Sequence, residues 1–401
     1  MENRYEKYKD SGIAWIGNIP EHWEVKKLGH LYIPRNEKVS DKDYPALSVT
    51  MQGVLLQLEN VAKTNDGDNR KLVKIGDFAI NSRSDRRGSC GISKYDGSVS
   101  LINIVLTPIN DMNPVYYEWL FHSSLFSDEY YRWGHGIVND LWTTRWQEMK
   151  NIQIAAPPLH EQQLIATYLD QKCSEIDELI TLQEEMITKL QSYKQSVITE
   201  AVTKGLDKNV PLKDSGIEWI GEIPEHWKVV KIKYLAKIKS GDSISSNELI
   251  QAGIYEVYGG NGLMGYCNKN NVNGFNIIIG RVGALCGNVR LISDSKFITD
   301  NALILNCFDN ALYPYMYIML KAANLNNLNT SNAQPLITGS KVLNVSLPIP
   351  PLSEQQSIAD YLDQKCSEID ELISIKQQKI EKLKDYKKSL IFECVTGKRK
   401  V

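Results

Sequence analysis

Long apolar runs, paired cysteines and a strong net charge are all missing from this 401-residue chain. No apolar stretch approaches the ~18 residues that a membrane-spanning helix requires, so we expect no contact with a membrane. The seven cysteines include no Cys-x-x-Cys pair, and this pattern fits a reducing cytosol better than a disulfide framework. The first ten residues, MENRYEKYKD, are polar and charged, which predicts no signal peptide and a cytoplasmic protein.

The net charge of −2 does not by itself indicate a partner, but the charge is unevenly distributed. Residues 228–344 hold 11 Lys or Arg against 6 Asp or Glu, an excess of +5. Residues 24–150 hold 16 against 16, and residues 151–205 hold 4 against 8. A basic footprint is typical of DNA-binding proteins, and its weakness here leaves DNA binding as an open hypothesis on charge alone.

An internal repeat organises the chain. The segment YKDSGIAWIGNIPEHWEVKKL at 8–28 returns as LKDSGIEWIGEIPEHWKVVKI at 212–232, and we call these two segments box 1 and box 2. The segment LDQKCSEIDELI at 169–180 returns letter for letter at 362–373. The period is far too long for a solenoid, so each copy is a domain-sized unit.

Two unlike stretches lie between the repeated elements. Residues 29–150 and 233–344, here called reader 1 and reader 2, share almost no sequence. A nearly unchanged frame around two unlike inserts suggests one scaffold that presents two different recognition surfaces. An ordinary enzyme with one active site has no need of this plan.

A wide apolar stripe marks the repeated helical segments. With Gln162 at heptad position a, eight of the twelve a and d positions up to Glu200 are apolar, and an apolar e column lies beside them. Such a stripe suits a helix bundle or a partnered coiled coil. We therefore expect these helices to bind partner proteins through Ile176, Leu179, Ile180, Ile187, Leu190, Ile369, Leu372, Ile373, Ile380 and Leu383.

Prolines and caps set the expected helix boundaries. Each helix should begin after a double proline, because the first N–H groups of a helix have no intrahelical partner. The first helix should end near Gly205. Two internal pairs match the spacing of a capping box and leave a break or kink open in each helix: Ser174 with Asp177, and Ser367 with Asp370.

Each reader has the pattern of a compact α+β domain. Short β-type runs separated by Gly and Asn clusters lie at 101–106, 275–279, 288–292 and 302–305. Helical pieces are expected at 115–126 and 313–323. The predicted division of the chain is a first reader domain at 1–152, a central helix at 153–205, a second reader domain at 206–345 and a C-terminal helix at 346–401.

Several short motifs have structural explanations that we favour over chemical ones. Gly260–Gly265 matches GxGxxG, but a poor helix former follows it, so we expect a contact loop rather than a nucleotide site. Asn113–Tyr116 is near the Asn-Pro-Pro-Tyr motif of amino-methyltransferases but lacks its second proline. His160-Glu161 is no zinc motif, because Leu164 stands where HExxH requires His. His22 and His226, in the boxes, are expected to pack or cap.

The polar loops of the readers carry the positive signals. Arginine can bond guanine O6 and N7 or clamp a phosphate, and Asn81–Gly88 holds three arginines, although pairing with Asp85 would make it an ordinary turn. Tyr258–Gly262 offers backbone groups and an amide suited to adenine, unless it is only a hairpin turn. Trp133–Trp142 is either a contact loop or the site of a buried Trp pair. The candidate DNA-binding residues are Arg83, Ser84, Arg86, Arg87, His135, Asn139, Thr143, Gly259, Gly260, Asn261, Arg281, Asn288, Asn332 and Gln334.

The repeated segments resemble those of a known family, the specificity subunits of type I restriction–modification enzymes. The resemblance is carried by the boxes, by PPLHEQQLIATYLDQKCSEIDELI at 157–180, and by PPLSEQQSIADYLDQKCSEIDELI at 350–373. In reader 2, the segments YGGNGLMGY (258–266), IIIGRVGALCGNV (277–289) and TDNALIL (299–305) add to it. It covers essentially the whole chain.

The resemblance implies an α+β fold, with two target-recognition domains in pseudo-two-fold arrangement, separated by two long antiparallel coiled-coil helices. Each domain would read one half of a split, asymmetric double-stranded DNA target, and the helices would act as a ruler. Such a subunit has no catalytic site. It would bind two methyltransferase subunits and the restriction–translocase subunits, and these partners would carry S-adenosylmethionine, ATP and Mg²⁺.

Two other interpretations remain open from the sequence. The chain could be a stand-alone methyltransferase or nuclease, although no cofactor loop or catalytic signature supports this. It could also be a coiled-coil adaptor whose variable domains bind proteins. The neutral charge of reader 1 leaves open how much phosphate affinity that half contributes.

Overall fold

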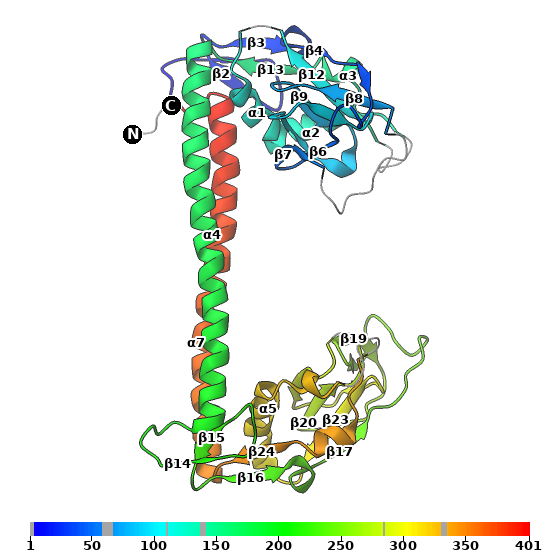
Figure 1. Cartoon of the computed structure of the whole chain (residues 1–401), viewed down its shortest axis with the longest axis vertical. Coiled ribbons are helices and arrows are strands. Elements are labelled where there is room, and N and C mark those ends of the chain that lie inside the picture. Colours follow the sequence, from blue (N-terminus) through cyan, green and yellow to red (C-terminus); the bar gives the residue numbers. More distant parts are fainter. Residues whose placement is uncertain (1–3, 58–66, 110, 137–141, 284, 330–334) are drawn as a thin grey trace. The chain divides into compact units, whose positions relative to one another are not determined.

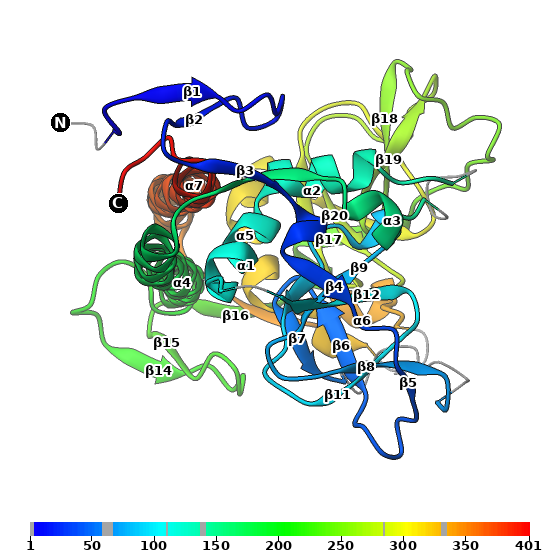
Figure 2. The ribbon, with the colours of Figure 1, turned by 90° about the horizontal axis from the view of Figure 1, so that it is seen from above.

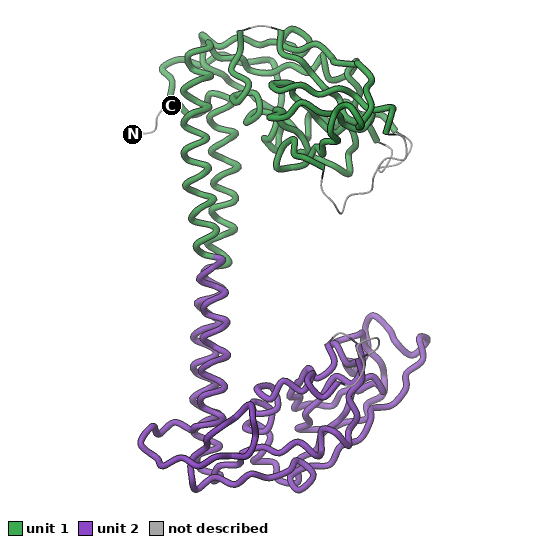
Figure 3. Tube along the Cα trace, in the orientation of Figure 1, with its two compact units in different colours: residues 1–183, 377–401 green, residues 184–376 purple. Residues whose placement is uncertain are grey.

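The computed structural model describes residues 4–57, 67–109, 111–136, 142–283, 285–329 and 335–401. The chain forms two compact units, coloured separately in Figure 3. Unit 1 contains residues 1–183 and 377–401, and unit 2 contains residues 184–376. Each unit therefore holds one box, one reader and part of each long helix.

Unit 1 is built around a four-stranded antiparallel sheet of order β10-β9-β12-β4, with a three-stranded sheet β11-β8-β5 and a hairpin β6-β7 beside it (Figure 1). Its helices are α1 (Pro114–His122), α2 (Ser124–Arg132) and α3 (Trp146–Met149). Its strands are β1 (Tyr8–Asp10), β2 (Asn18–Pro20), β3 (Glu24–Lys27), β4 (Tyr32–Pro34), β5 (Lys38–Val39), β6 (Leu47–Thr50), β7 (Gly53–Leu56), β8 (Arg70–Val73), β9 (Phe78–Asn81), β10 (Cys90–Ile92), β11 (Gly97–Val99), β12 (Asn103–Pro108) and β13 (Gln153–Ala156).

Unit 2 repeats the four-stranded antiparallel sheet as β17-β23-β20-β21, with a three-stranded sheet β19-β18-β22 beside it. Its reader contains the helices α5 (Tyr313–Ala322) and α6 (Gly339–Leu343). Its strands are β14 (Leu212–Asp214), β15 (Glu222–Pro224), β16 (Lys228–Lys231), β17 (Ala236–Ser240), β18 (Tyr255–Gly259), β19 (Gly262–Cys267), β20 (Asn276–Gly280), β21 (Val289–Ile292), β22 (Phe297–Ile298), β23 (Ala302–Cys307) and β24 (Ser346–Ile349).

The central strands are apolar on both faces, because each face is covered. Successive side chains of a strand point to opposite faces. In β9, Phe78 and Ile80 join the large core cluster that includes α1, whereas Ala79 packs with Leu47 of β6 in a separate small cluster. In β20, alternate residues divide in the same way between two clusters. The continuous apolar runs predicted as strands at 101–106, 275–279, 288–292 and 302–305 are confirmed within a few residues.

The two readers share one strand register despite their unlike sequences. Asn81 of β9 pairs with Asn103 of β12, and the equivalent pair in unit 2 is Gly280 with Ala302. Tyr116 of α1 and Tyr315 of α5 are also equivalent, since each is buried and each donates its hydroxyl to the end of a long helix. The predicted helical pieces at 115–126 and 313–323 are confirmed as α1 with the start of α2, and as α5.

The boxes anchor each reader to the first turn of a long helix. The indole N–H of the fully buried Trp23 donates to Glu161 Oε2 at 3.0 Å, and that of Trp227 donates to Glu354 Oε2 at 2.9 Å. His22 lies 2.5 Å from Glu161, and His226 lies 2.7 Å from Glu354. These contacts agree with the expected packing role of the two box histidines.

The long helices α4 (Leu159–Lys204) and α7 (Leu352–Val395) are each continuous. A break at Ser174 or Ser367 is therefore wrong. Each serine lies in the interior of a continuous helix, where the backbone N–H groups already donate to carbonyl groups of the preceding turn. No free N–H group therefore remains for a serine cap to accept from. Helix α4 ends directly before Gly205, which has φ +75°, as predicted.

Within each unit the two helices run antiparallel, side by side as seen in Figure 2. In unit 1, Lys387 Nζ lies 2.6 Å from Asp177 Oδ2; in unit 2, Lys194 Nζ lies 2.6 Å from Asp370 Oδ2. These ion pairs are equivalent, because Asp370 and Lys387 each stand 193 positions after their counterparts. The two helix pairs thus share an equivalent ion pair between their helices.

Candidate DNA-recognition surfaces

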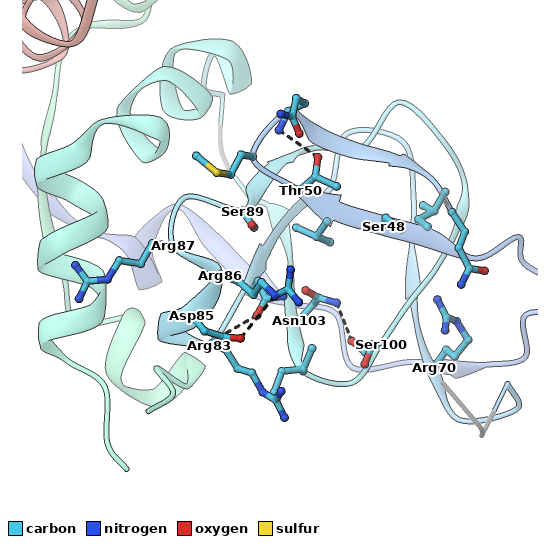
Figure 4. A pocket seen from close by; sticks show the side chains of 17 residues that line it. Ser48, Thr50, Arg70, Arg83, Asp85, Arg86, Arg87, Ser89, Ser100 and Asn103 are labelled. Atoms are coloured by element: carbon cyan, nitrogen blue, oxygen red, sulfur yellow. Dashed lines mark hydrogen bonds and ion pairs between the residues drawn. The ribbon is translucent and has the colours of Figure 1, made fainter. Parts of the chain in front are cut away.

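Reader 1 has a cavity of about 570 Å³, lined by polar and apolar residues, between the β6-β7 hairpin and the adjoining ends of β9 and β12 (Figure 4). Three arginines of the predicted turn, Arg83, Arg86 and Arg87, contribute to its wall. Other lining residues include Ser48, Thr50, Gln52, Arg70, Asn81, Ser89, Ser100 and Asn103. The predicted arginine cluster therefore lies at the end of the central strands and beside a pocket.

The three arginines are in different electrostatic surroundings. Arg86 Nε lies 3.7 Å from Asp85, a pairing between exposed side chains. Arg87 donates to Asp128 at 3.0 Å and lies over the ring of Tyr131, so it is held against α2 and points away from Asn103 in Figure 4. Arg83 lines the cavity and, among the described residues, makes no ion pair. Arg83 is therefore the arginine of this turn that is most available to a ligand.

Asn103 lines the same cavity. The residue is 5% exposed, and its amide N–H donates to Ser100 O at 3.1 Å. Its Oδ1 has no hydrogen-bond partner within the described part of the chain. A buried acceptor without a partner destabilises the folded protein. A ligand that donated a hydrogen bond to this oxygen would remove that cost, and its binding would be stronger for it.

Trp142 and Thr143, at the described end of the predicted contact loop, lie against the arginine turn, since Ser84 N donates to Trp142 O at 3.0 Å. Thr143 forms β-bridges with both Arg83 and His135, so three predicted DNA-binding residues are brought together through their backbones. Among the described residues, Trp133 and Trp142 do not form the expected Trp pair: the Trp133 indole donates to Glu129, and the Trp142 indole donates to Tyr131 O. Ser84 lines a neighbouring hollow with Trp142. Asn139 lies outside the described residues.

Reader 2 has a glycine hairpin beside the end of its central strand β20. Gly259 ends β18, Gly260 and Asn261 form the turn, and β19 follows, so the GxGxxG segment begins a strand rather than a nucleotide-binding helix. A Cβ on Gly260 would lie 2.7 Å from Asn301 O, which explains why a residue without a side chain stands there. Arg290 donates to Asn261 O at 2.9 Å and steadies the turn.

Arg281 lies immediately after β20, beside this hairpin. Its Nη1 is 3.3 Å from Ser240 Oγ and 3.4 Å from Asp300 O, and its Nε is buried without a partner in the described part of the chain. Asn288 lies close by, since its carbonyl accepts from Gly280 N. Asn332 and Gln334 lie outside the described residues. Reader 2 thus gathers the predicted residues Gly259, Gly260, Asn261, Arg281 and Asn288 at one edge.

The predicted partner-binding residues of the helices divide into three groups by their exposure. Ile176, Ile369 and Ile380 are buried within their units, so they hold the helix pair together. Leu179 and Leu372, at equivalent positions, are exposed on 44% and 48% of their surfaces. Ile180, Ile187, Leu190, Ile373 and Leu383 are half-buried. Exposed neighbours that sequence reasoning did not select are Leu182, Met186 and Ile375.

The remaining motifs have structural roles. Asn113 caps α1, accepting from Tyr116 N at 3.1 Å, so the Asn-Pro-Val-Tyr segment is a helix start. Among the described residues no cluster of His, Cys, Asp or Glu is arranged to hold a metal ion. Within the same residues, no helix combines the length and apolarity that crossing a membrane demands.

Sequence reasoning missed Asn103, Arg70 and Arg290. Asn103 is the first residue of an apolar strand, a position that gives no signal until the strand is placed beside the cavity. Arg290 faces the hairpin only because β21 pairs with β20.

The chain has clear relatives. The family model described as the type I restriction modification DNA specificity domain matches residues 20–191 and 224–385. The chain is 25% identical to the type I restriction enzyme MjaVIII specificity subunit of Methanocaldococcus jannaschii, over 96% of this chain and 94% of that protein. It is 27% identical to the putative MjaX specificity subunit of the same organism, over 96% of both.

Two solved structures share the fold. The HsdS subunit from Thermoanaerobacter tengcongensis matches with a TM-score of 0.55 and 18% identity, over 94% of this chain and 98% of that one. A chain from work on complex assembly and conformational transition of the type I R-M system matches with a TM-score of 0.77 and 15% identity, over the same shares.

The family model matches once in each half and covers most of the chain, and the matched regions include both readers. In this family the chain is the recognition component and not the catalytic one, and the cofactors belong to the modification and restriction subunits. The chain therefore belongs to the type I restriction–modification family of DNA specificity subunits.

Proposed function

We propose that this chain reads a split, asymmetric DNA target, with reader 1 contacting one half and reader 2 the other. The observation that carries the proposal is the common strand register of the readers combined with their different edges. Arginines and a cavity occupy one edge, and a glycine hairpin with Arg281 occupies the other. Different donors and acceptors at equivalent positions select different bases.

The spacing between the half-sites follows from the helices. At about 1.5 Å per residue, a 46-residue α4 is roughly 69 Å long. One turn of DNA is about 34–36 Å. We infer that the spacer in the target has one fixed length, because both readers are attached to the same two continuous helices.

We further propose that the exposed stripe around Leu179 and Leu372 binds two methyltransferase subunits, to which the restriction subunits add. The stripe lies on equivalent faces of both units, and a pseudo-two-fold surface suits two identical partners. A structure with a similar fold comes from work on complex assembly of the type I R-M system.

The test is to express the chain with its methyltransferase in a host that lacks other adenine methylation, and to sequence the methylated sites. We expect one motif with two unlike specified halves and a spacer of unspecified bases. A continuous motif, or a methylation pattern that does not depend on this chain, would refute the proposal.

A further inference from the structure

In unit 1, Arg399 lies beside Glu393 and Tyr386 of α7 and Tyr168 of α4, and we call the place between these three side chains the cleft. Arg399 Nε donates to Glu393 Oε2 at 2.9 Å, and Arg399 N donates to Glu393 O. This hydrogen bond raises the pKa of Arg399 above its usual value, and Tyr168 and Tyr386 lie near enough to contribute. Only about a third of the Arg399 and Glu393 side chains is exposed. The arginine is therefore an integral part of this cleft.

The same cleft recurs in unit 2 without an arginine. Glu200, Tyr193 and Tyr361 stand at the positions equivalent to Glu393, Tyr386 and Tyr168, each related by 193 residues. They line a cavity of about 270 Å³. The cation paired with Glu200 is Lys208, at 3.4 Å, and its side chain is 85% exposed. Lys208 thus lies at the rim and leaves the cleft open.

The difference arises where the helices end. Helix α7 is followed by Thr396, Gly397, Lys398 and Arg399, whereas α4 is followed by Gly205 and Leu206. Both glycines have positive φ and turn the chain sharply. The turn brings Arg399 to Glu393 in unit 1, whereas Leu206, 193 positions before Arg399, is one of the residues that line the cavity in unit 2. Unit 2 therefore keeps the carboxylate and both tyrosines, with a leucine in place of the arginine.

We propose that the cleft of Glu200, Tyr193 and Tyr361 receives an arginine side chain from a methyltransferase subunit. This inference rests on the proposed function. A guanidinium matches the cleft because it can bond a carboxylate through two N–H groups and can stack on tyrosine rings. The tail of a second copy of this chain is not available, since Lys398 donates to Asn18 O and Val401 packs against the core of its own unit.

The proposal makes the two docking ends unequal. At the unit 1 end, Arg399 already occupies the cleft, so a methyltransferase finds no carboxylate to bind there. At the unit 2 end, the partner gains an ion pair and ring contacts. The methyltransferase at unit 2 should therefore be held more tightly than the one at unit 1.

The first experiment measures peptide binding to the full-length chain. The probe is a fluorescent peptide with the sequence of residues 396–401, TGKRKV, and its control is TGKAKV. We expect the arginine peptide to bind about tenfold more tightly, corresponding to about 1.4 kcal/mol. Glu200→Gln should remove this preference, Glu185→Gln on the same helix should keep it, and Lys208→Ala should strengthen binding. Equal binding of both peptides overturns the inference.

The second experiment measures how many methyltransferase subunits stay bound on dilution, by mass photometry of the assembled complex. Glu200→Gln should lose a methyltransferase at roughly tenfold higher concentration than wild type, and Glu185→Gln should match wild type. A Glu200→Gln complex that dissociates like wild type overturns the inference, even if the peptide binds. Failure of the proposed function would be seen separately, as wild-type chain that recruits no methyltransferase or directs no methylation.

Discussion

Each reader contains a four-stranded sheet of the same topology, but different residues follow the central strands in the two readers. After β9 the chain continues as Ser82-Arg83, and after β20 it continues as Arg281-Val282, so an arginine follows both strands with a shift of one position. Because side chains alternate between faces, this shift sends the two guanidinium groups in different directions. The comparison teaches that buried strand residues set the architecture, while the candidate recognition residues lie just beyond the strands.

The boxes and long helices, in contrast to the readers, make equivalent contacts in the two units. Trp23 with Glu161 and Trp227 with Glu354 form the same hydrogen bond. Tyr116 donates to Val395 O of α7, and Tyr315 donates to Val202 O of α4. Each reader is therefore completed by the end of the helix that belongs to the other repeat, and the frame is interchangeable where the readers are not.

The largest expected effect comes from removing one half. A fragment ending at Gly205 lacks Leu390, Ile391, Cys394 and Val395, which are buried in the core of unit 1. The equivalent residues of a second fragment, Val197, Ile198, Ala201 and Val202, can fill that place. We expect a two-fold dimer whose methylated target is an interrupted palindrome of the first half-site, detected by light scattering and methylation sequencing.

Two results would count against this symmetry. One is a fragment that stays monomeric at micromolar concentration, and the other is a dimer that still methylates the asymmetric site. A matched control is the same fragment with Val202→Asp, which places a charge in the shared core and should not dimerise.

The next effect concerns the surface that both halves share. Changing Leu179 and Leu372 together to Asp places charge in the centre of the exposed stripe without altering the buried helix contacts. We expect loss of complex formation with the methyltransferase, measured by co-purification, while the chain remains folded by circular dichroism. Leu164→Asp, at another exposed apolar position of α4, is the control. Normal co-purification of the double variant would show that the stripe is not the docking surface.

Smaller effects should come from the readers themselves. Single Ala substitutions at Arg83, Arg86, Arg87, Asn261 and Arg281 should each cost about 1–3 kcal/mol of DNA affinity where a base contact is lost. We expect Arg83 to matter more than Arg87, because Asp128 and Tyr131 already hold Arg87. Gel-shift titrations of the assembled complex measure this. Five variants with wild-type affinity would refute the assignment.

The smallest effect concerns a side-chain hydrogen bond in unit 1, between Tyr5 and the first turn of α4. Tyr5 donates to Glu161 at 2.7 Å. Burial alone would raise the pKa of Glu161, but hydrogen bonds from Trp23, Tyr5 and His22 outweigh it and leave the pKa below the usual 4.5. A lowered folded-state pKa stabilises the protein above about pH 4.5, and this stability is lost as the pH falls further.

Tyr5→Phe should therefore destabilise unit 1 by roughly 1–2 kcal/mol at neutral pH and reduce its loss of stability in acid. Hydrogen exchange of box 1 amides between about pH 3 and pH 7 measures the change, and box 2 amides serve as an internal reference. Tyr95→Phe is the control, since within the described part of the chain only backbone atoms of Tyr95 are hydrogen-bonded. Equal exchange in Tyr5→Phe and wild type would show that this bond contributes nothing.

Sequence reasoning predicted the frame well because its signals are local and occur twice. Repeated letters identified boxes and helices, and apolar runs identified the central strands. The possible break at Ser174 was wrong, because a capping-box spacing inside a helix carries no information on whether the neighbouring packing keeps the helix intact. Ile165, Leu169 and Cys173 are buried on one side of that serine and Ile176 on the other, so the core holds this part of the helix in place.

The recognition surfaces were predicted only in part. The arginine turn and the glycine hairpin were visible as short polar motifs, and both lie at the sheet edge. Asn103 was not visible, because its role depends on pairing with Asn81 across the sheet and on the β6-β7 hairpin that closes the cavity. Long-range pairing of this kind leaves no mark in a local stretch of sequence.

One measurement tests the central claim, that the unlike edges read separate halves of one target. It compares the methylated motifs of complexes carrying Arg83→Ala or Arg281→Ala with that of the wild type, by sequencing of the host genome. The account predicts that Arg83→Ala relaxes a base position in one half only, that Arg281→Ala relaxes a position in the other half only, and that the spacer keeps its length in both. Relaxation of the same half by both variants, or of both halves by either one, would contradict it.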